Sequence, residues 1–112
     1  MSPDENDLAH LWDMLHACQE IIEFSQGVAF ADFTADRMLV LAVERSLEII
    51  GEAAGRVSPP LQKKQGKIPW KLLRGMRNIL AHEYGQIDYE VIYQTAMRDV
   101  PALHKKLKEI LR

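Results

Sequence analysis

The chain has 112 residues, of which 47% are hydrophobic and 27% charged, and its formal net charge is −2 at pH 7. These values favour one folded domain over residues 1–112 and exclude a disordered chain. No apolar run is long enough to predict a membrane span, and the first residues lack the basic start of a signal peptide. A single cysteine excludes an internal disulfide and a cysteine-based zinc site, so we expect a cytoplasmic protein.

The first predicted helix starts at Ser2-Pro3-Asp4-Glu5, where Ser2 and Glu5 have the spacing of a capping box. It should end near Gly27. Apolar residues recur along it at helical spacing: Leu8, Leu11, Trp12, Leu15, Cys18 and Ile22. The thiol of Cys18 lies on this apolar side, so we expect it to be buried and inert.

The second predicted helix begins at residues 33–36 with Thr34 as its cap, and it ends near Val57, before two prolines. Residues 38–50 are apolar nearly all round, which predicts the central helix of the domain. Its polar side carries three acidic residues: Glu44, Glu48 and Glu52. Gly51 and Gly55 allow a close approach, either by another helix of the same chain, which we favour, or by a second subunit.

A lysine-rich link over residues 61–67, with room for one helical turn, leads to Pro69, which opens the third helix. One arc of this helix is apolar and should face the core: Leu72, Leu73, Met76, Ile79 and Leu80. The opposite arc carries polar and basic residues: Arg74, Asn78 and His82 form one ridge along the helix, and Arg77 lies beside it. We expect the helix to loosen near His82 and to end close to Gly85.

The last predicted helix has Asp88 as its cap, with Ile87 and Ile92 as a hydrophobic staple, and continues to Leu111. Pro101 should kink or divide it, because proline removes a backbone donor and crowds the preceding turn. With no strand pattern in the chain, these elements predict an all-α, antiparallel four-helix bundle with a kinked C-terminal helix.

Positive charge is concentrated in the middle of the chain. The span from Ala53 to His82 holds no acidic residue and seven basic ones: Arg56, Lys63, Lys64, Lys67, Lys71, Arg74 and Arg77. The other residues carry 16 acidic and seven basic side chains, a balance of −9. This distribution is typical of a phosphate-binding surface, although a solvated basic loop would look the same.

The segment Arg74 to Tyr84, with the sequence RGMRNILAHEY, places Arg77, His82 and Tyr84 at the spacing R-x4-H-x-Y. With its flanking phrases, such as EIIGEA upstream, this sequence resembles the HepT-like ribonuclease toxins of the HEPN superfamily from about Leu8 to Leu111. The resemblance implies a homodimeric endoribonuclease that needs no metal or other cofactor and is the toxin of a type VII-like toxin–antitoxin pair.

Under this resemblance Arg77 and His82 are the catalytic residues and Asn78 supports them, and from the basic run we expect Arg74 and Lys71 to bind RNA. Histidine can transfer protons at neutral pH and arginine can stabilise a phosphorane, so the expected product is a 2′,3′-cyclic phosphate. Five residues subtend about 140° on a helix, so Arg77 and His82 converge poorly within one chain, and a dimer would supply both groups to one cleft.

The resemblance also implies that a minimal nucleotidyltransferase of the MntA type is the antitoxin and transfers AMP to Tyr84. A second hypothesis is a HEPN-type module without nuclease activity that dimerises and binds this partner. Purely structural roles stay open as well: His82 at a helix end, Arg77 paired with an acidic residue, and Tyr84 packed on the core. The remaining histidines have no such context and should lie at the surface or its boundary: His10, His16 and His104.

Overall fold

The computed structural model describes residues 5–80 and 88–112, except for the side chains of residues 77–80. Within these ranges every regular element is helical and no strand occurs. The elements are α1 (Glu5–Ser25), α2 (Phe30–Ala35), α3 (Arg37–Arg56), α4 (Pro59–Lys64), α5 (Trp70–Leu80), α6 (Tyr89–Gln94), a π-helical turn (Thr95–Asp99) and α7 (Val100–Ile110).

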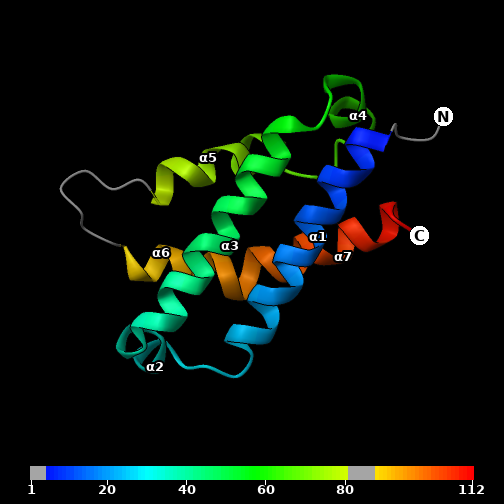
Figure 1. Cartoon of the computed structure of the whole chain (residues 1–112). Coiled ribbons are helices and arrows are strands. Elements are labelled where there is room, and N and C mark those ends of the chain that lie inside the picture. The colour runs from blue at the N-terminus through cyan, green and yellow to red at the C-terminus, as the bar shows by residue number, and fades with distance from the viewer. Residues whose placement is uncertain (1–4, 81–87) are drawn as a thin grey trace.

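The long helices form a bundle in which α3 lies between α1 and α5 and packs against both (Figure 1). α1 and α3 run in opposite directions, and α6, the π-helical turn and α7 cross the same bundle as one interrupted rod. The all-α bundle expected from the sequence is confirmed, and so is the central position of α3. No helix among the described residues is both long and apolar enough to cross a lipid bilayer.

The buried stripe of α1 differs in part from the expected one. Leu11, Leu15 and Cys18 are buried as predicted, and the stripe continues through Met14 and Ile21. A fully buried side chain of this size contributes about 2 kcal/mol to folding. Trp12, by contrast, is 43% exposed, and its ring lies 5.6 Å from that of His16 on the next turn of the same helix.

The predicted start of the central helix was wrong. Thr34 belongs to the short helix α2, where its Oγ1 donates to the Ala31 carbonyl at 3.0 Å. α3 begins three residues later, and its cap is Asp36, whose carboxylate accepts from the Leu39 amide at 3.1 Å. Asp36 has an extended backbone and satisfies a donor that the first turn leaves free, which is how an N-cap works.

Pro101 divides the last helix, as predicted. The division takes the form of a π-helical turn just upstream, where the Val100 amide donates to the Thr95 carbonyl five residues before it. Thr95 also donates through Oγ1 to the Val91 carbonyl at 2.7 Å. Because proline has no amide hydrogen, the regular i to i−4 pattern fails here, and a wider turn absorbs the mismatch. The predicted cap Asp88 is confirmed, since its carboxylate accepts from the Val91 amide at 3.1 Å.

A buried carboxylate ties the start of α1 to the end of α3. Asp7 is 5% exposed, and its two oxygens accept from the amide and the hydroxyl of Ser58 at 2.8 and 2.6 Å. Ser58 precedes Pro59, the first residue of α4, which begins two residues before the lysine-rich link in which one helical turn was expected. The contact therefore joins two elements 51 residues apart in the chain.

Cys18 is 0% exposed, which confirms the prediction of a buried thiol. Burial raises the pKa of this thiol to about 12, because an apolar environment disfavours the thiolate. Only the thiolate is nucleophilic, so Cys18 is a packing residue of α1 rather than a reactive group.

Candidate functional site

α5 carries the first part of the R-x4-H-x-Y segment, and it is fixed to α3 by its apolar side. Leu73 and Met76 are 1% and 2% exposed, and both belong to the continuous core. Trp70 begins the helix, and its indole nitrogen donates to the Gln65 carbonyl at 3.0 Å, which holds the preceding loop. The orientation of α5 is thus set before the motif residues are reached.

Leu72 does not belong to the core, contrary to the sequence prediction. It is 47% exposed and lines a hollow of about 380 Å³ together with Val91 and Thr95 of the last helical rod. The reason is the width of the apolar arc: Leu73 and Met76 face α3 directly, and Leu72 lies at the margin of that arc, where no described helix covers it.

The predicted catalytic residues cannot be placed by their side chains. Arg77 and Asn78 lie within α5, but their side chains are outside the described part of the structure. His82 and Tyr84, like the expected helix end at Gly85, fall in residues 81–87 and lie outside it entirely. Their roles therefore remain predictions.

The two predicted RNA-binding residues, Lys71 and Arg74, are both exposed on α5. The guanidinium of Arg74 donates through Nη1 to Oε1 of Gln62 at 2.6 Å. The amide nitrogen of Gln62 donates in turn to the Val57 carbonyl at 2.9 Å and to the Ala54 carbonyl at 3.4 Å. Arg74 is thus held in a defined orientation by a side chain that is itself anchored on the end of α3.

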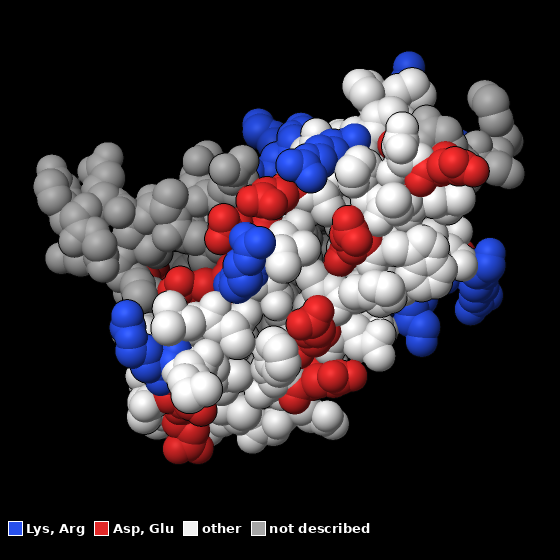
Figure 2. Space-filling view, in the orientation of Figure 1, with Lys and Arg blue, Asp and Glu red and all other residues white. Residues whose placement is uncertain are grey.

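Arg74 borders a hollow of about 470 Å³ between α3 and α5, which we call the arginine hollow. Its lining consists of five residues: Gly51, Glu52, Gly55, Arg56 and Arg74. Figure 2 shows the basic side chains gathered over the C-terminal end of α3, next to acidic ones. Gly51 is buried, whereas a Cβ atom added at Gly55 would meet nothing within 4 Å, so only the first of the two glycines lies in the packed interior.

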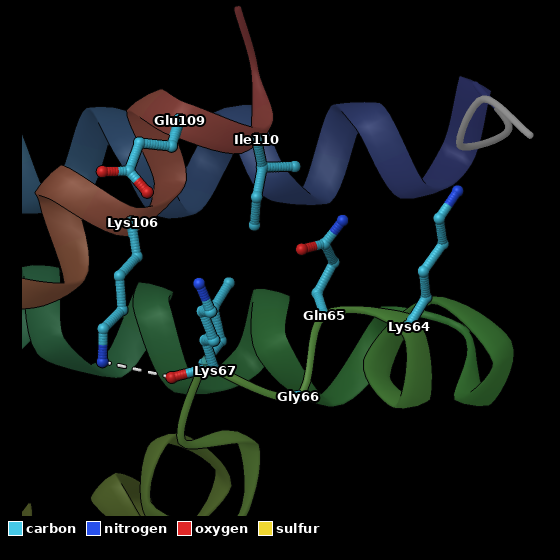
Figure 3. Close-up of a pocket in the computed structure, with 8 residues that line it drawn as sticks. Lys64, Gln65, Gly66, Lys67, Lys106, Glu109 and Ile110 are labelled. Carbon is cyan, nitrogen blue, oxygen red and sulfur yellow. Dashed lines mark hydrogen bonds between the residues drawn. The ribbon is translucent and has the colours of Figure 1, made fainter.

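A second hollow, of about 350 Å³, lies between the loop after α4 and α7 (Figure 3). Lys64 and Lys67 border it on one side, and Lys106 and Glu109 on the other. Lys106 reaches across the gap and donates through Nζ to the Lys67 carbonyl at 3.1 Å. This ammonium group therefore closes the loop onto α7, and its charge is partly used in that contact.

The basic run of the sequence is thus divided between two places in the fold. Arg56 and Arg74 line the arginine hollow, and Lys64 and Lys67 line the hollow at α7. Two residues of these hollows were not predicted from the sequence: Gln62, which orients Arg74, and Lys106, which adds a third lysine to the second hollow. Helical periodicity relates neighbours on one helix only, whereas these contacts join residues 12 and 39 positions apart.

The histidines of the described ranges lie at the surface or its boundary, as expected. His104 is partly buried, and burial, followed by the neighbouring charge of Lys108, lowers the pKa of its imidazole. Across residues 5–80 and 88–112, no three His, Cys, Asp or Glu side chains lie close enough to hold one metal ion.

Comparison with known proteins gives consistent matches over nearly the whole chain. The sequence model of a family described as "Ribonuclease HepT-like" matches residues 14–110. A protein of Caldanaerobacter subterraneus subsp. tengcongensis named "Putative RNase" is 42% identical over 103 residues, covering 92% of each chain. A Methanocaldococcus jannaschii protein, also named "Putative RNase", is 37% identical over 100 residues, covering 89% of this chain and 92% of that protein.

A protein of Thermococcus cleftensis named "Probable ribonuclease HepT" is 35% identical over 101 residues, which cover 90% of this chain and 92% of the relative. No solved structure gives a significant match to this chain.

Proposed function

This chain belongs to the HepT-like ribonuclease family, and from that membership we propose that it is a metal-independent endoribonuclease and the toxin of a toxin–antitoxin pair. The observation that carries the proposal is the family match over residues 14–110, because this span includes the whole R-x4-H-x-Y segment.

The proposed reaction is attack of a ribose 2′-hydroxyl on the adjacent phosphorus. One histidine takes the hydroxyl proton, the new O–P bond forms as the bond to the 5′-oxygen breaks, and a second group returns a proton to that leaving oxygen. His82 fills the proton-transfer role and Arg77 stabilises the phosphorane charge with its guanidinium, with Asn78 orienting the imidazole or an RNA oxygen. The products are a 2′,3′-cyclic phosphate and a free 5′-hydroxyl.

The active unit in this proposal is a homodimer. About 140° separates Arg77 from His82 around a straight helix, so one copy of the motif does not converge on a single phosphate. A twofold axis that brings two such helices together supplies two arginines and two histidines to one cleft.

Regulation in this proposal is covalent. A partner nucleotidyltransferase transfers AMP from ATP to the Tyr84 hydroxyl, which forms a phosphodiester bond to tyrosine and releases pyrophosphate. Tyr84 is two residues from His82 and seven from Arg77 in the sequence, so the added phosphate would occupy the phosphate site and repel RNA.

The test is incubation of the purified chain with total RNA in the presence of EDTA. We expect cleavage that leaves 2′,3′-cyclic phosphate ends, and we expect His82→Ala to abolish both cleavage and cellular toxicity while keeping the wild-type melting temperature. An active His82→Ala variant with a lowered melting temperature would instead make His82 a structural residue.

A catalytically inactive HEPN-type module that binds the nucleotidyltransferase is the second candidate. It predicts no cleavage by the wild type under any metal condition, together with retained dimerisation and retained binding of the partner enzyme.

A further inference from the structure

Among the described residues, the two arginines of the arginine hollow have no carboxylate partner. In the described part of the chain, ion pairs form at Arg45 and at Arg98, whereas neither Arg56 nor Arg74 lies within 4.0 Å of an acidic oxygen. Two positive groups on one hollow repel each other, and a bound anion relieves that repulsion. Arg56 comes from the last turn of α3 and Arg74 from α5, so the two approach an occupant from different helices.

The net charge of the lining indicates the kind of anion. Arg56 and Arg74 contribute two positive charges and Glu52 one negative charge, so the lining carries a net charge of +1. An internal phosphodiester of a nucleic acid carries a single negative charge, whereas a terminal phosphate is close to a dianion at neutral pH. Charge balance therefore favours a phosphodiester within a strand over a free phosphate or a mononucleotide.

Gln62 holds the Arg74 side chain in place before any ligand binds. Its oxygen accepts from Arg74 at 2.6 Å, and its amide nitrogen is held by the Val57 and Ala54 carbonyls, so the guanidinium does not have to be ordered when a ligand binds. A guanidinium has five donors, and four remain after this contact, which is enough for a bidentate pair with phosphate oxygens.

The floor of the hollow is open to a bulky ligand. Gly55 has no side chain, and apart from the adjoining residues and backbone of its own helix no heavy atom lies within 4 Å of the place where a Cβ would lie; the volume of about 470 Å³ is within the range of small-molecule sites. Arg74 lies one turn before Asn78 on α5, so the hollow is next to the segment with the proposed catalytic residues.

We propose that the arginine hollow binds a phosphodiester of the RNA substrate beside the scissile one, with Arg56 and Arg74 holding its oxygens. Gln62 is a positioning residue that acts through Arg74. This inference rests on the proposed function, because it takes the ligand of the hollow to be the substrate of that reaction.

The test is binding of a short single-stranded RNA, measured by fluorescence anisotropy with the non-cleaving His82→Ala variant as the common background. Arg56→Ala and Arg74→Ala should each weaken binding about fivefold to tenfold, as expected for a charge-assisted hydrogen bond. Each should also reduce the slope of log K against log salt concentration by about 0.7, the value for one lost contact to a single strand. Arg45→Ala is the matched control, since it removes an exposed arginine of α3 outside the hollow.

Gln62→Met tests the positioning role, because it keeps the length of the side chain and removes the whole amide group, both the oxygen that accepts from Arg74 and the nitrogen that anchors it. It should weaken RNA binding when Arg74 is present and have no further effect in combination with Arg74→Ala. A residue that only supports the fold would lower the melting temperature and would weaken binding equally in both backgrounds. Arg56→Gln and Arg74→Gln replace any alanine variant that fails to melt cooperatively.

The inference would be overturned if the Arg56→Ala and Arg74→Ala variants bound RNA with the same affinity as the Arg45→Ala control. That result would leave the proposed function intact. A wild-type chain that neither binds nor cuts RNA would overturn the proposed function itself. Inorganic phosphate and sodium chloride should displace RNA to a similar extent at equal ionic strength. Much stronger displacement by phosphate would indicate a site for free phosphate, which also contradicts the inference.

Discussion

Asp7 is a single residue on which two parts of the chain depend. Its carboxylate is buried and accepts two hydrogen bonds from Ser58, one of them from the backbone amide at the start of α4. Hydrogen bonds to a charged acceptor are stronger than neutral ones, and a buried amide left without a partner costs additional free energy.

Asp7→Ala should therefore lower the free energy of unfolding by about 2 to 3 kcal/mol. Ser58→Ala should cost about 1 kcal/mol, because it removes the hydroxyl and keeps the amide contact. Urea unfolding at one fixed protein concentration measures both values, and the exposed Asp13→Ala on the same helix is the control. Equal losses for Asp7→Ala and Asp13→Ala would show that the contact contributes nothing.

Tyr84→Phe tests the proposed modification, and the chain offers a matched control. The hydroxyl of Tyr93 donates to the Val28 carbonyl at 2.6 Å, and its ring contacts those of Phe30 and Phe33. After treatment with the partner nucleotidyltransferase and ATP, intact-mass measurement should show added AMP on the wild type and on Tyr93→Phe, and none on Tyr84→Phe. Equal labelling of Tyr84→Phe and the wild type would place the modified residue elsewhere.

At the scale of an element, the start of α3 shows how one cap decides where a helix begins. Asp36→Ala should lower the free energy of unfolding by about 1 kcal/mol, because the amide of Leu39 loses its acceptor. Thr34→Ala, which changes the cap expected from the sequence, should cost less than about 0.5 kcal/mol, as for an ordinary surface change. A larger loss at Thr34 than at Asp36, measured by urea unfolding, would contradict this assignment of the cap.

Local signals predicted those helix boundaries that have one clear marker. Asp88, Gly27 and Pro101 each mark a start, an end or a break, and Gly27 has the positive φ of 74° that ends a helix readily. The start of α3 was missed because Thr34 and Asp36 are two good caps separated by one residue. Nothing in the sequence shows that the helical turn containing Thr34 stops before α3 begins.

The faces of the helices were harder to predict than their boundaries. Periodicity identified the apolar arcs, but the packing of neighbouring helices decides which edge of an arc is covered. Trp12 is 43% exposed beside the buried stripe of α1, and Met38 is 83% exposed on the side of α3 away from its buried residues. For the candidate site, the sequence identified the helix and its arginines. The contact between Gln62 and Arg74 needed the tertiary structure, because the two residues come from different elements.

At the scale of the whole molecule, the proposed dimer makes a prediction that a monomeric enzyme does not. Arg77→Ala and His82→Ala should each be inactive. Co-expressed, they should recover up to about half of the wild-type activity, since half of the dimers are mixed and the shared cleft of a mixed dimer keeps one Arg77 and one His82. Sedimentation at micromolar concentration should show dimers throughout. A mixture as inactive as its components would place both residues of a site in one chain.

The burial of Cys18 has a practical consequence for measuring such an assembly. It is the only cysteine in the chain, it is fully buried, and its pKa is raised to about 12, so maleimide reagents at neutral pH have almost no thiolate to attack. A cysteine introduced at an exposed position such as Gln19 or Lys105 would thus be the single reactive thiol of an otherwise native sequence. One spin label there would occur twice in a symmetric pair, and the distance between the two labels would report the geometry of the interface directly.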